Sequence, residues 1–516
     1  MERREAHGAD TPDQRALVEA LKKPAAYGDR VAKVRVAETH ISWVFLTGEF
    51  AYKVKKPIKL PFLDFSTLEL RRHFCDEELR LNQRLAPNLY LGVVPIGGKP
   101  SAPRVGAEPA IEFAVQMRQF PDDARLDRRL AATDLAPALR AFAANLARFH
   151  SDLPPLAPHE ARADAIAAMR DNFAVLEKQV PPAELEPLRA WTERCANAIG
   201  PLLERRGTRG RYRECHGDLH LENLLLLDGE IVAFDALEFD PKLREIDVAS
   251  EAAFPVMDLL AHDRPGLGYT FLTAYLEAGG DYDGLDVLRF YMVHRALVRA
   301  KVRAIKAEQK AAESGRDAIA PYLATARALV APHVPLLVIT HGLSGSGKTH
   351  VTDALIGGLR AVRARSDLER KRLLGLAPDA RTGSAVGAGI YDAASTKHTY
   401  TRLAEIAAMA LRAGFDAIVD ATFLLRAERA QLRAVADQAG ARFAILDCDA
   451  PEGVLRDRVA RRERAHSDAS EAGLAVLDRQ LADREPLGQD DARHAVRVAT
   501  DRALDRDALL TGLARL

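Results

Sequence analysis

Short apolar runs alternate with longer amphipathic stretches along the last third of the chain. Apolar residues gather at 336–340, 361–364, 416–419 and 443–446. Each run has the length of a buried strand, and a stretch with helical spacing follows it. Strands that alternate with helices form parallel sheets with right-handed crossovers, so the pattern predicts an α/β doubly wound sheet. Its ligands are expected at the carboxyl ends of the strands. Helices alone are expected from 450 to the end.

The first half of the chain has a different pattern. Residues 33–56 contain β-rich runs that break at Thr47-Gly48, which indicates an antiparallel hairpin. A strand is predicted within 106–121, ending in a connector. Antiparallel strands followed by helices indicate an α+β fold. Helices are expected at 66–85, 135–150, 160–205 with an interruption at Pro181-Pro182, and 285–331.

The chain has 516 residues, enough for three compact domains at roughly 100 to 200 residues each. Pro332 and Pro335 stop the last helix of the first half and mark a boundary. The connector after the strand within 106–121 would be the hinge of a two-lobed kinase, so we expect lobes at 1–120 and 121–330, followed by a third domain at 334–516. Fragments cut at this boundary are expected to fold independently, because each has its own core.

Residues 342–349 read G-x-x-x-x-G-K-T, the phosphate-binding loop, between an apolar run and a helical stretch that extends to Leu359. The glycines let backbone N–H groups turn toward a phosphate, and the helix N-terminus adds partial positive charge. Lys348 is expected to reach the β- and γ-phosphates of ATP, and Thr349 to hold Mg2+. The predicted nucleotide-binding residues are Gly342, Ser344, Gly345, Ser346, Gly347, Lys348 and Thr349.

Two acidic residues are expected at strand ends near this loop. Asp367 is predicted to end the second strand of the sheet, and Asp420 the third. Asp420 is the expected partner of Mg2+, with a helix cap as the alternative. Asp367 is the expected catalytic base for an acceptor hydroxyl, and Arg370, three residues on, is expected to bind the acceptor.

A basic helix is predicted near the end of the chain. Arg458 and Arg462 are four residues apart and therefore share a helical face. We expect Arg458 to bind ATP and Arg462 to stabilise the transferring phosphoryl group, with Arg461 as the alternative. A polar loop at 465–470 follows and is a candidate to close over ATP.

Residues 50–53, F-A-Y-K, have the pattern of the protein-kinase strand V-A-I-K. Ala51 and Lys53 share one strand face, so that a small residue lies under adenine while the lysine meets the phosphates. Lys53 is the predicted phosphate ligand, and Lys55, on the same face, is the runner-up.

The predicted helix 66–85 offers an acidic partner for this lysine. Glu78 is the first choice because Leu81 and Leu85 follow it at helical spacing. Glu77 is the alternative.

The stretch H-G-D-L-H-L-E-N at 216–223 contains the residue types that phosphoryl transfer to a hydroxyl needs. Asp218 supplies a carboxylate for the acceptor, and Asn223 supplies an oxygen ligand for Mg2+. Two apolar runs around a turn at 228–229 form a hairpin. The hairpin brings Asp235 back toward the loop as a second metal ligand.

Other polar residues nearby are expected to be structural. His216 is expected to brace the loop, and Asp247 to support the fold. Five arginines between 205 and 213 are interpreted as a solvated loop rather than an anion site.

The motif H-G-D-x-H-x-x-N, followed by a hairpin and F-D, resembles the aminoglycoside-phosphotransferase branch of the kinase-like fold. The resemblance covers about 30–300. One departure is that no G-x-G-x-x-G precedes the lysine strand, and T-H-I-S at 39–42 stands in its place. The resemblance implies that Asp218 is the catalytic base, Asn223 and Asp235 hold magnesium, and Lys53 holds ATP phosphates.

Residues 335–500 resemble small P-loop kinases of the polynucleotide-kinase-like kind, through D-L-E-R at 367–370 and the later arginines. Taken whole, the chain resembles the family of bifunctional aminoglycoside phosphotransferase/ATP-binding proteins. This resemblance implies an α+β two-lobed kinase-like module followed by an α/β doubly wound P-loop NTPase module. It implies ATP and Mg2+ as cofactors and leaves the acceptor undefined.

Charge and cysteine content narrow the range of partners. Lys and Arg number 73, as do Asp and Glu, so no overall field attracts nucleic acid or an anionic membrane. The four cysteines lack C-x-x-C spacing, so neither a disulfide framework nor a zinc site is indicated. The N-terminus lacks the apolar core of an export signal, and no apolar run reaches about 18 residues. We expect a cytoplasmic protein without a membrane span, and the sequence does not indicate an oligomeric state.

These features predict an ATP-dependent phosphotransferase with two kinase modules, each acting on a hydroxyl acceptor. Nucleic acid is an expected partner only as acceptor for the P-loop module. One rival is a nucleotide-gated regulatory protein, against which the complete set around Asp218 argues. Another is an ATPase that uses water, and the acceptor residues Asp367 and Arg370 argue against it.

Overall fold

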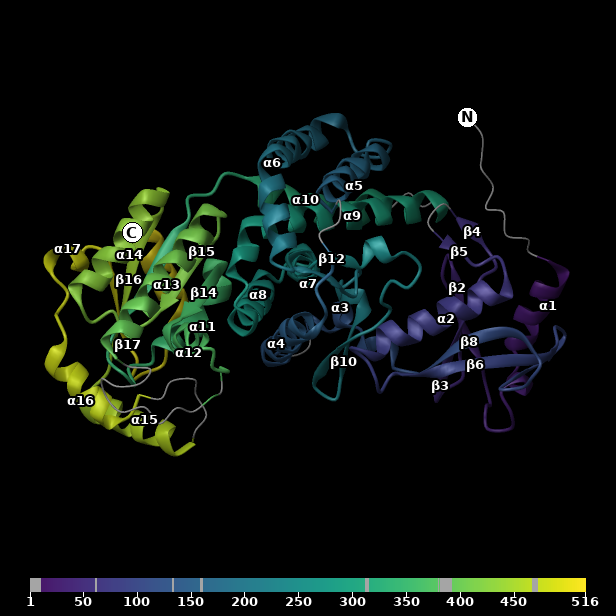
Figure 1. Ribbon diagram of the computed structural model, residues 1–516, viewed down its shortest axis with the longest axis horizontal. Helices are drawn as coiled ribbons and strands as arrows, with labels where there is room; N and C mark the ends of the chain where they lie inside the picture. Colours follow the sequence, from purple (N-terminus) through teal and green to yellow (C-terminus); the bar gives the residue numbers. More distant parts are fainter. Residues whose placement is uncertain are drawn as a thin grey trace. The chain divides into compact units, whose positions relative to one another are not determined.

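The computed structural model describes residues 11–60, 63–131, 134–157, 161–310, 315–378, 380, 392–465 and 472–516. The chain forms two compact units (Figure 1). The first unit takes residues 1–134, 154–157 and 210–251, and the second takes 135–153, 158–209 and 252–516. The expected boundary at 332–335 therefore does not separate the units, because the helices before it and the sheet after it belong to the second one.

A sheet of six antiparallel strands forms much of the first unit, in the order β1-β2-β3-β8-β6-β7 (Figure 1). The predicted hairpin joins β2 to β3, with Val44 opposite Lys53. The β6–β7 hairpin was missed from the sequence, because glycine and proline interrupt the alternation of apolar residues in β6. The strands are β1 (Arg35–Glu38), β2 (Ser42–Leu46), β3 (Phe50–Lys55), β6 (Tyr90–Lys99), β7 (Ala102–Val105) and β8 (Ala110–Arg118).

Helices cover both faces of this sheet. Helix α1 (Pro12–Leu21) packs against the face that bears Tyr52 and Val54. Helix α2 (Leu68–Gln83) packs against the other face, where Ala51 joins Cys75 in a core cluster. Because side chains alternate along β3, Lys53 and Lys55 project from the same face as Ala51, as the sequence predicts.

Three pairs of strands, β10–β11, β9–β12 and β4–β5, complete the described part of the first unit. Strands β10 and β11 form the predicted hairpin, and both turn residues, Asp228 and Gly229, have positive φ, which a two-residue turn requires. Strand β9 pairs with β12. The remaining elements are β4 (Lys59–Leu60), β5 (Leu63–Asp64), α3 (Leu126–Arg129), β9 (Tyr212–Glu214), β10 (Leu224–Leu227), β11 (Glu230–Ala233), β12 (Glu245–Asp247) and α7 (Val248–Ala261), which runs into the second unit.

The second unit begins with helices. The predicted interruption at 181–182 is present, because proline fits the first turn of α6 but not the end of α5. The helical pattern predicted over 285–331 corresponds to two helices, α9 and α10, that pack against each other, and 311–314 lie outside the described residues. The helices are α4 (Ala136–Asp152), α5 (Ala161–Leu176), α6 (Pro182–Thr208), α8 (Pro265–Gly279), α9 (Leu285–Lys310) and α10 (Gly315–Val330).

A parallel sheet of five strands follows, in the order β14-β15-β13-β16-β17 (Figure 1). The α+β region and this α/β sheet confirm the predicted fold class. Strand β17 corrects the expectation of helices alone after 450. Its five residues lie at the sheet edge with one buried side chain, so they lack a clear apolar run. The strands are β13 (Leu336–His341), β14 (Ala361–Arg365), β15 (Asp416–Asp420), β16 (Arg442–Asp449) and β17 (Ala495–Ala499).

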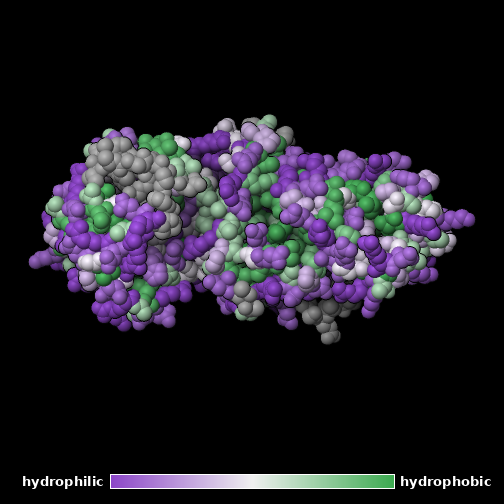
Figure 2. All heavy atoms as spheres, turned by 90° about the horizontal axis from the view of Figure 1, so that it is seen from below, coloured by the Kyte–Doolittle hydropathy of each residue, from purple (hydrophilic) through white to green (hydrophobic). Residues whose placement is uncertain are grey.

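Helices connect these strands. The helices are α11 (Lys348–Leu359), α12 (Ser366–Leu373), α13 (Ala393–Arg412), α14 (Arg426–Ala439), α15 (Glu452–Ala465), α16 (Leu474–Asp483), α17 (Gln489–Ala492) and α18 (Arg506–Arg515). Hydrophilic residues cover much of the face drawn in Figure 2, with smaller hydrophobic areas between them. Within the described part of the chain, no helix is both long and apolar enough to cross a membrane.

Candidate active sites

The side chain of Lys53 lies between two carboxylates in the first unit. Its ammonium nitrogen is 2.7 Å from Oε1 of Glu78 and 2.6 Å from Oδ1 of Asp235. Strand β3, helix α2 and the segment after β11 supply these three residues. The structure therefore brings together three residues that the sequence singled out separately.

Helix α2 explains why Glu78 rather than Glu77 meets the lysine. Thr67 caps the helix by accepting a hydrogen bond from the N–H of Leu70, which fixes where the helix begins. With the helix starting there, the side chain of Glu78 faces the sheet and is fully buried. Glu77 pairs with Arg80 on a different side of the helix. The alternative Glu77 is thus not part of the cluster.

The runner-up lysine, Lys55, belongs to the same cluster. Its Nζ lies 2.8 Å from Oε2 of Glu78, and it also contacts the carboxylate of Glu238. Lys55 and Glu238 are almost completely buried, whereas the side chain of Asp235 is 45% exposed. Lys53 is therefore at the accessible end of the cluster, where a nucleotide can reach it.

Electrostatics keep this cluster charged. Burial favours the neutral form of Glu78, but Lys53 and Lys55 outweigh burial and lower its pKa to about 2. Burial likewise opposes the charge of Lys53, and the neighbouring carboxylates of Asp235 and Glu78 raise its pKa well above the ordinary value. Both partners are ionised at neutral pH.

The loop at 216–223 holds Asp218 and Asn223 against each other. Nδ2 of Asn223 donates to the backbone oxygen of Asp218 at 3.0 Å and to its Oδ2 at 3.1 Å. Because the amide nitrogen serves Asp218, the amide oxygen remains as a ligand atom for a cation. Nε2 of His220 lies 3.2 Å from the same carboxylate oxygen of Asp218.

The hairpin returns Asp235 toward this loop, as predicted. The backbone N–H of Phe234 donates to the backbone oxygen of Asn223 at 3.0 Å. The next residue, Asp235, therefore lies beside the end of the loop. Asp235 has φ 63°, an uncommon conformation for a residue other than glycine, and its N–H donates to the hydroxyl of Tyr90. Asn223 and Asp235 together offer the oxygen ligands that Mg2+ prefers.

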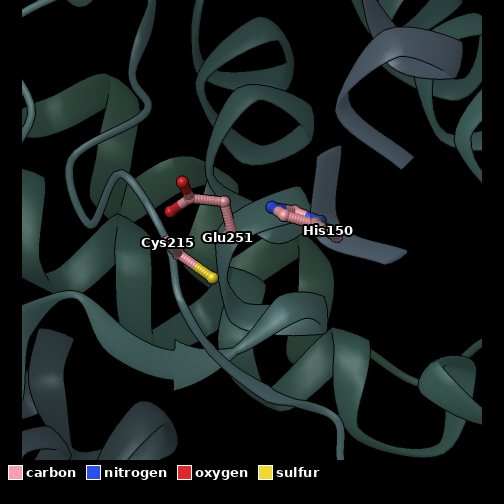
Figure 3. Close-up of side chains that lie close together, drawn as sticks. All are labelled: His150, Cys215 and Glu251. Carbon is pink, nitrogen blue, oxygen red and sulfur yellow. The ribbon is translucent and has the colours of Figure 1, made fainter. Parts of the chain in front are cut away.

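A buried glutamate, Glu251, braces the loop from the start of α7 (Figure 3). Its carboxylate accepts hydrogen bonds from the N–H groups of His216 at 2.7 Å and Gly217 at 3.1 Å. A side chain at Gly217 would place Cβ 2.7 Å from a backbone oxygen, so only glycine fits there. Cys215 is also drawn in Figure 3. His150, the third labelled residue, belongs to the second unit.

His216 has the bracing contacts that the sequence suggested. Its Nε2 lies 2.9 Å from the oxygen of Phe234, and its Nδ1 accepts from the N–H of Asp218. Burial lowers the pKa of His216, which favours the neutral ring that this pair of contacts needs. Asp247 caps α7 by accepting from the N–H of Ala249, a structural role.

Most of the arginines at 205–213 are not a solvated loop. Arg205, Arg206 and Arg209 form ion pairs with acidic residues between 281 and 286, and Arg206 is buried. These pairs lie within the second unit and support its helices.

The phosphate-binding loop lies between β13 and α11 in the second unit. Gly342, Gly345 and Gly347 all have positive φ, and a Cβ on Gly342 would lie 2.4 Å from the oxygen of Cys448. Nζ of Lys348 folds back to donate to the oxygens of Gly342 at 3.0 Å and Leu343 at 2.8 Å. The loop therefore has the turn that its glycines predict.

Thr349 and Asp420 meet beside this loop. The hydroxyl of Thr349 donates to Oδ2 of Asp420 at 2.8 Å. Asp420 is the last residue of β15, as predicted. Burial lowers the pKa of Lys348, while the charge of Asp420 opposes that shift. The hydroxyl and the carboxylate are an oxygen pair that fits Mg2+.

The position predicted for Asp367 is wrong. Strand β14 ends at Arg365, and Asp367 lies in the first turn of α12. Asp367 and Arg370 nonetheless line the same cavity of about 940 Å3 as Lys348 and Asp420. A serine and an acidic residue after an apolar run favour the start of a helix, a signal that locates Asp367 correctly.

The arginines of α15 differ in their surroundings. Arg458 donates to the oxygen of Gly345 at 3.3 Å and to that of Thr500 at 2.6 Å, so it braces the loop backbone. Arg462 donates to the oxygen of Ala472 at 2.7 Å, and both arginines line the cavity. Arg461 is exposed and is not among the lining residues. Most of the polar loop expected at 465–470 lies outside the described residues.

Other helices contribute to the cavity in ways that the sequence did not indicate. Gln480 of α16 accepts from the N–H of Ser344 at 2.8 Å. Tyr400 of α13 and Glu428 of α14 line the cavity, and burial raises the pKa of Glu428. Each lies on a helix without a motif, so no local pattern identifies it.

Comparisons with known proteins found one family model, relatives and solved structures that are similar to parts of the chain. The model of the AAA domain family matches residues 337–487. The chain is 30% identical over 462 residues to the uncharacterized protein Rv2004c of Mycobacterium tuberculosis, covering 87% of this chain and 90% of that protein. A choline/ethanolamine kinase family protein from Mesorhizobium loti is 13% identical with a TM-score of 0.39, covering 62% of this chain and 95% of that chain. A gluconokinase from Sinorhizobium meliloti is 21% identical with a TM-score of 0.26, covering 36% and 94%.

Proposed function

The chain belongs to the family of the mycobacterial protein Rv2004c, and we propose that it is a bifunctional ATP-dependent phosphotransferase. In this proposal two kinase modules each transfer the γ-phosphate of ATP to the hydroxyl group of an acceptor. The order of a kinase-like module and a P-loop kinase module was predicted from the sequence. The transfer reactions and their acceptors are the proposal.

The observation that carries the proposal is the position of Lys53 between Glu78 and Asp235, at 2.7 Å and 2.6 Å. A lysine held by a helix glutamate beside a metal-binding aspartate is the arrangement with which kinases position ATP phosphates. Glu78 is buried and stays ionised, so it fixes the ammonium group without competing with a nucleotide at the accessible side.

The chemistry of the first module follows from its loop. Asp218 would accept the proton of the acceptor hydroxyl as the oxygen bonds to the γ-phosphorus and the bond to the β-phosphate oxygen breaks, releasing ADP. Asn223 and Asp235 would hold Mg2+. When bound, Mg2+ neutralises charge that develops on the phosphate oxygens.

The second module has the same parts on a different scaffold. Lys348 and Arg462 would stabilise the phosphoryl group, and Thr349 and Asp420 would hold Mg2+. Asp367 would accept the acceptor proton, and Arg370 would bind the acceptor. All six line one cavity of about 940 Å3, a volume suited to a nucleotide and a small acceptor.

Separate inactivation of the modules in the full-length protein tests the proposal. Wild type, Asp218→Asn, Lys348→Met and the double variant are incubated with γ-labelled ATP, Mg2+ and a panel of hydroxyl metabolites and oligonucleotides. We expect each single variant to lose a different set of labelled products and the double variant to lose both. Label released only as phosphate would favour an ATPase, and wild type without any labelled product or phosphate release would favour the regulatory alternative.

A further inference from the structure

Helix α8 covers the edge strand of the parallel sheet within the second unit. It packs against α11 and β14, and the hydroxyl of Thr273 donates to the oxygen of Ala361 at 3.4 Å. A Cβ on Gly357 would lie 2.5 Å from the Cα of Gly266, so the backbones of α11 and α8 touch where they cross. Since α8 ends about sixty residues before the P-loop sheet begins, this contact joins helices of the kinase-like module to that sheet.

A buried arginine, Arg363, lies at this contact. It projects from β14 and is 2% exposed. Its Nε lies 2.8 Å from Oε1 of Glu277 on α8, and its Nη1 donates to the hydroxyl of Thr352 at 2.9 Å. The Thr352 hydroxyl lies 3.3 Å from Oδ2 of Asp420. Glu277, Arg363 and Thr352 thus form a path from α8 to the carboxylate of Asp420.

The chemistry of the groups fixes the direction of this chain. A guanidinium group only donates and a carboxylate only accepts. The Thr352 hydroxyl, between Arg363 and Asp420, therefore accepts from the arginine and points its hydrogen toward the carboxylate or toward the oxygen of Thr349, which lies 3.1 Å away. Oδ2 of Asp420 also accepts from the hydroxyl of Thr349. When the Thr352 hydrogen points toward the carboxylate, Arg363 is linked to Oδ2 of Asp420 through this hydroxyl.

The same stretch of chain contacts α12, the helix that bears Asp367 and Arg370. Arg372 of α12 donates to the backbone oxygen of Glu277, and the hydroxyl of Tyr282 donates to the oxygen of Arg363 at 3.0 Å. Helix α8 and its continuation therefore contact both β14, which bears Arg363, and α12, which bears Asp367 and Arg370.

We propose that Arg363 is a positioning residue of the P-loop site, and that Glu277 of α8 sets its position. This inference rests on the proposed function, in which Thr349 and Asp420 hold the divalent cation of Mg2+–ATP. It adds that the helices of the kinase-like module tune cation binding at the second active site. Neither Glu277 nor Arg363 touches the nucleotide in this scheme.

The charges around Arg363 predict how the removal of Glu277 changes the affinity of the site for Mg2+. A buried guanidinium needs anionic partners, and Glu277 is its least exposed one, since the other, Asp353, is 42% exposed. Without the Glu277 charge, Arg363 interacts more strongly with Asp420, through Thr352 or directly. A carboxylate engaged by a cation binds Mg2+ more weakly. Removing Glu277 should therefore raise the Mg2+ concentration that the site requires.

The test measures cation binding rather than turnover. A fluorescent ATP analogue binds the full-length protein while Mg2+ is titrated, and only the signal that Lys348→Ala abolishes is counted. Glu277→Gln should raise the Mg2+ concentration for half-saturation about three- to tenfold because Arg363 is drawn toward Asp420. Thr352→Val should raise it by a similar factor for a different reason, because it removes the hydroxyl that separates Arg363 from Asp420 and lets the guanidinium contact the carboxylate directly. Binding of the analogue in EDTA should stay within twofold of wild type. The matched control is Arg412→Ala, which removes an ion pair to Asp286, a residue outside the path from Glu277 to Asp420.

Further variants distinguish positioning from general destabilisation. Thr352→Ser keeps the hydroxyl and should titrate as wild type, whereas Thr352→Val removes it without touching α8. The shifts from Glu277→Gln and Thr352→Val should not add in the double variant, because both act through the interaction of Arg363 with Asp420. Wild-type Mg2+ titrations in folded Glu277→Gln and Thr352→Val would overturn the inference. A wild-type protein without any Lys348-dependent signal would instead overturn the proposed function of this module.

Discussion

The ammonium nitrogen of Lys55 lies 2.8 Å from Oε2 of Glu78, and neither side chain is exposed. Lys53 contacts the other oxygen of the same glutamate, so one carboxylate is shared by two lysines. The two lysines differ in their remaining partners, since Glu238 is buried and Asp235 is accessible. Lys53 can therefore bind the phosphates of ATP, whereas Lys55 supports the fold.

Replacing each lysine by methionine should therefore have different effects. Lys55→Met leaves Glu238 buried without its cation, which typically costs about 3 to 5 kcal/mol of the free energy of unfolding. Lys53→Met leaves Glu78 paired with Lys55 and removes charge from the phosphate site, so the variant should fold and lose at least about a hundredfold in phosphoryl transfer. Chemical unfolding and the activity of the first module are the measurements. Equal destabilisation by both substitutions would contradict the distinction.

Local motifs account for most of what the sequence revealed about the sites. Asp218 and Asn223 share one loop, and a short hairpin connects that loop to Asp235, so spacing alone places them together. Glu78 was found because helical periodicity is visible over one turn. Glu238 and Glu251 were not predicted from the sequence. Each is buried against a partner that is distant in the sequence, and nothing in the residues next to a single glutamate indicates that it is buried.

The positions that were predicted incorrectly have a common physical cause. Asp367 was placed at a strand end, although the helix begins with Ser366 and takes Asp367 into its first turn. Strand β17 was missed because an edge strand buries few side chains and resembles an exposed segment. Element boundaries and edge strands depend on neighbours in space, which a single sequence does not display.

Substitution of Asp367 tests whether the second module is a kinase. Asp367→Asn should cut phosphoryl transfer about a hundredfold while leaving ATP affinity unchanged, because a general base serves only the acceptor. Lys348→Ala should lose both, since it removes charge from the phosphate site. Binding of labelled ATP and product formation by the full-length variants are measured together. If Asp367→Asn weakens ATP binding as much as Lys348→Ala does, the aspartate is not an acceptor base.

The stability of the second unit should fall in acid through His294. Burial, together with Arg295 and Lys301, lowers the pKa of His294 to about 3, against an ordinary value of 6.5. Above pH 6.5 neither state is protonated, and between 6.5 and 3 the unfolded state binds a proton that the folded state does not. Over that pH range, His294 lowers the free energy of unfolding by about 1.4 kcal/mol for each pH unit of acidification. Urea unfolding should show that the free energy of unfolding falls less between pH 7 and pH 5 in His294→Gln than in wild type.

Cutting the chain at the proline boundary should not release a stable P-loop domain. The structure leads to this expectation because fragment 334–516 lacks α8, which covers edge strand β14 in the second unit. The fragment would expose an unprotected sheet edge, a template for aggregation. It would also remove Glu277 from Arg363 and expose that side chain to solvent. Fragment 252–516 retains α8 and should be the more stable of the two.

Thermal unfolding and light scattering of both fragments at equal concentration are the measurements. A fragment 334–516 that is monomeric and unfolds at the same temperature as fragment 252–516 would show that α8 adds nothing to the stability of the sheet.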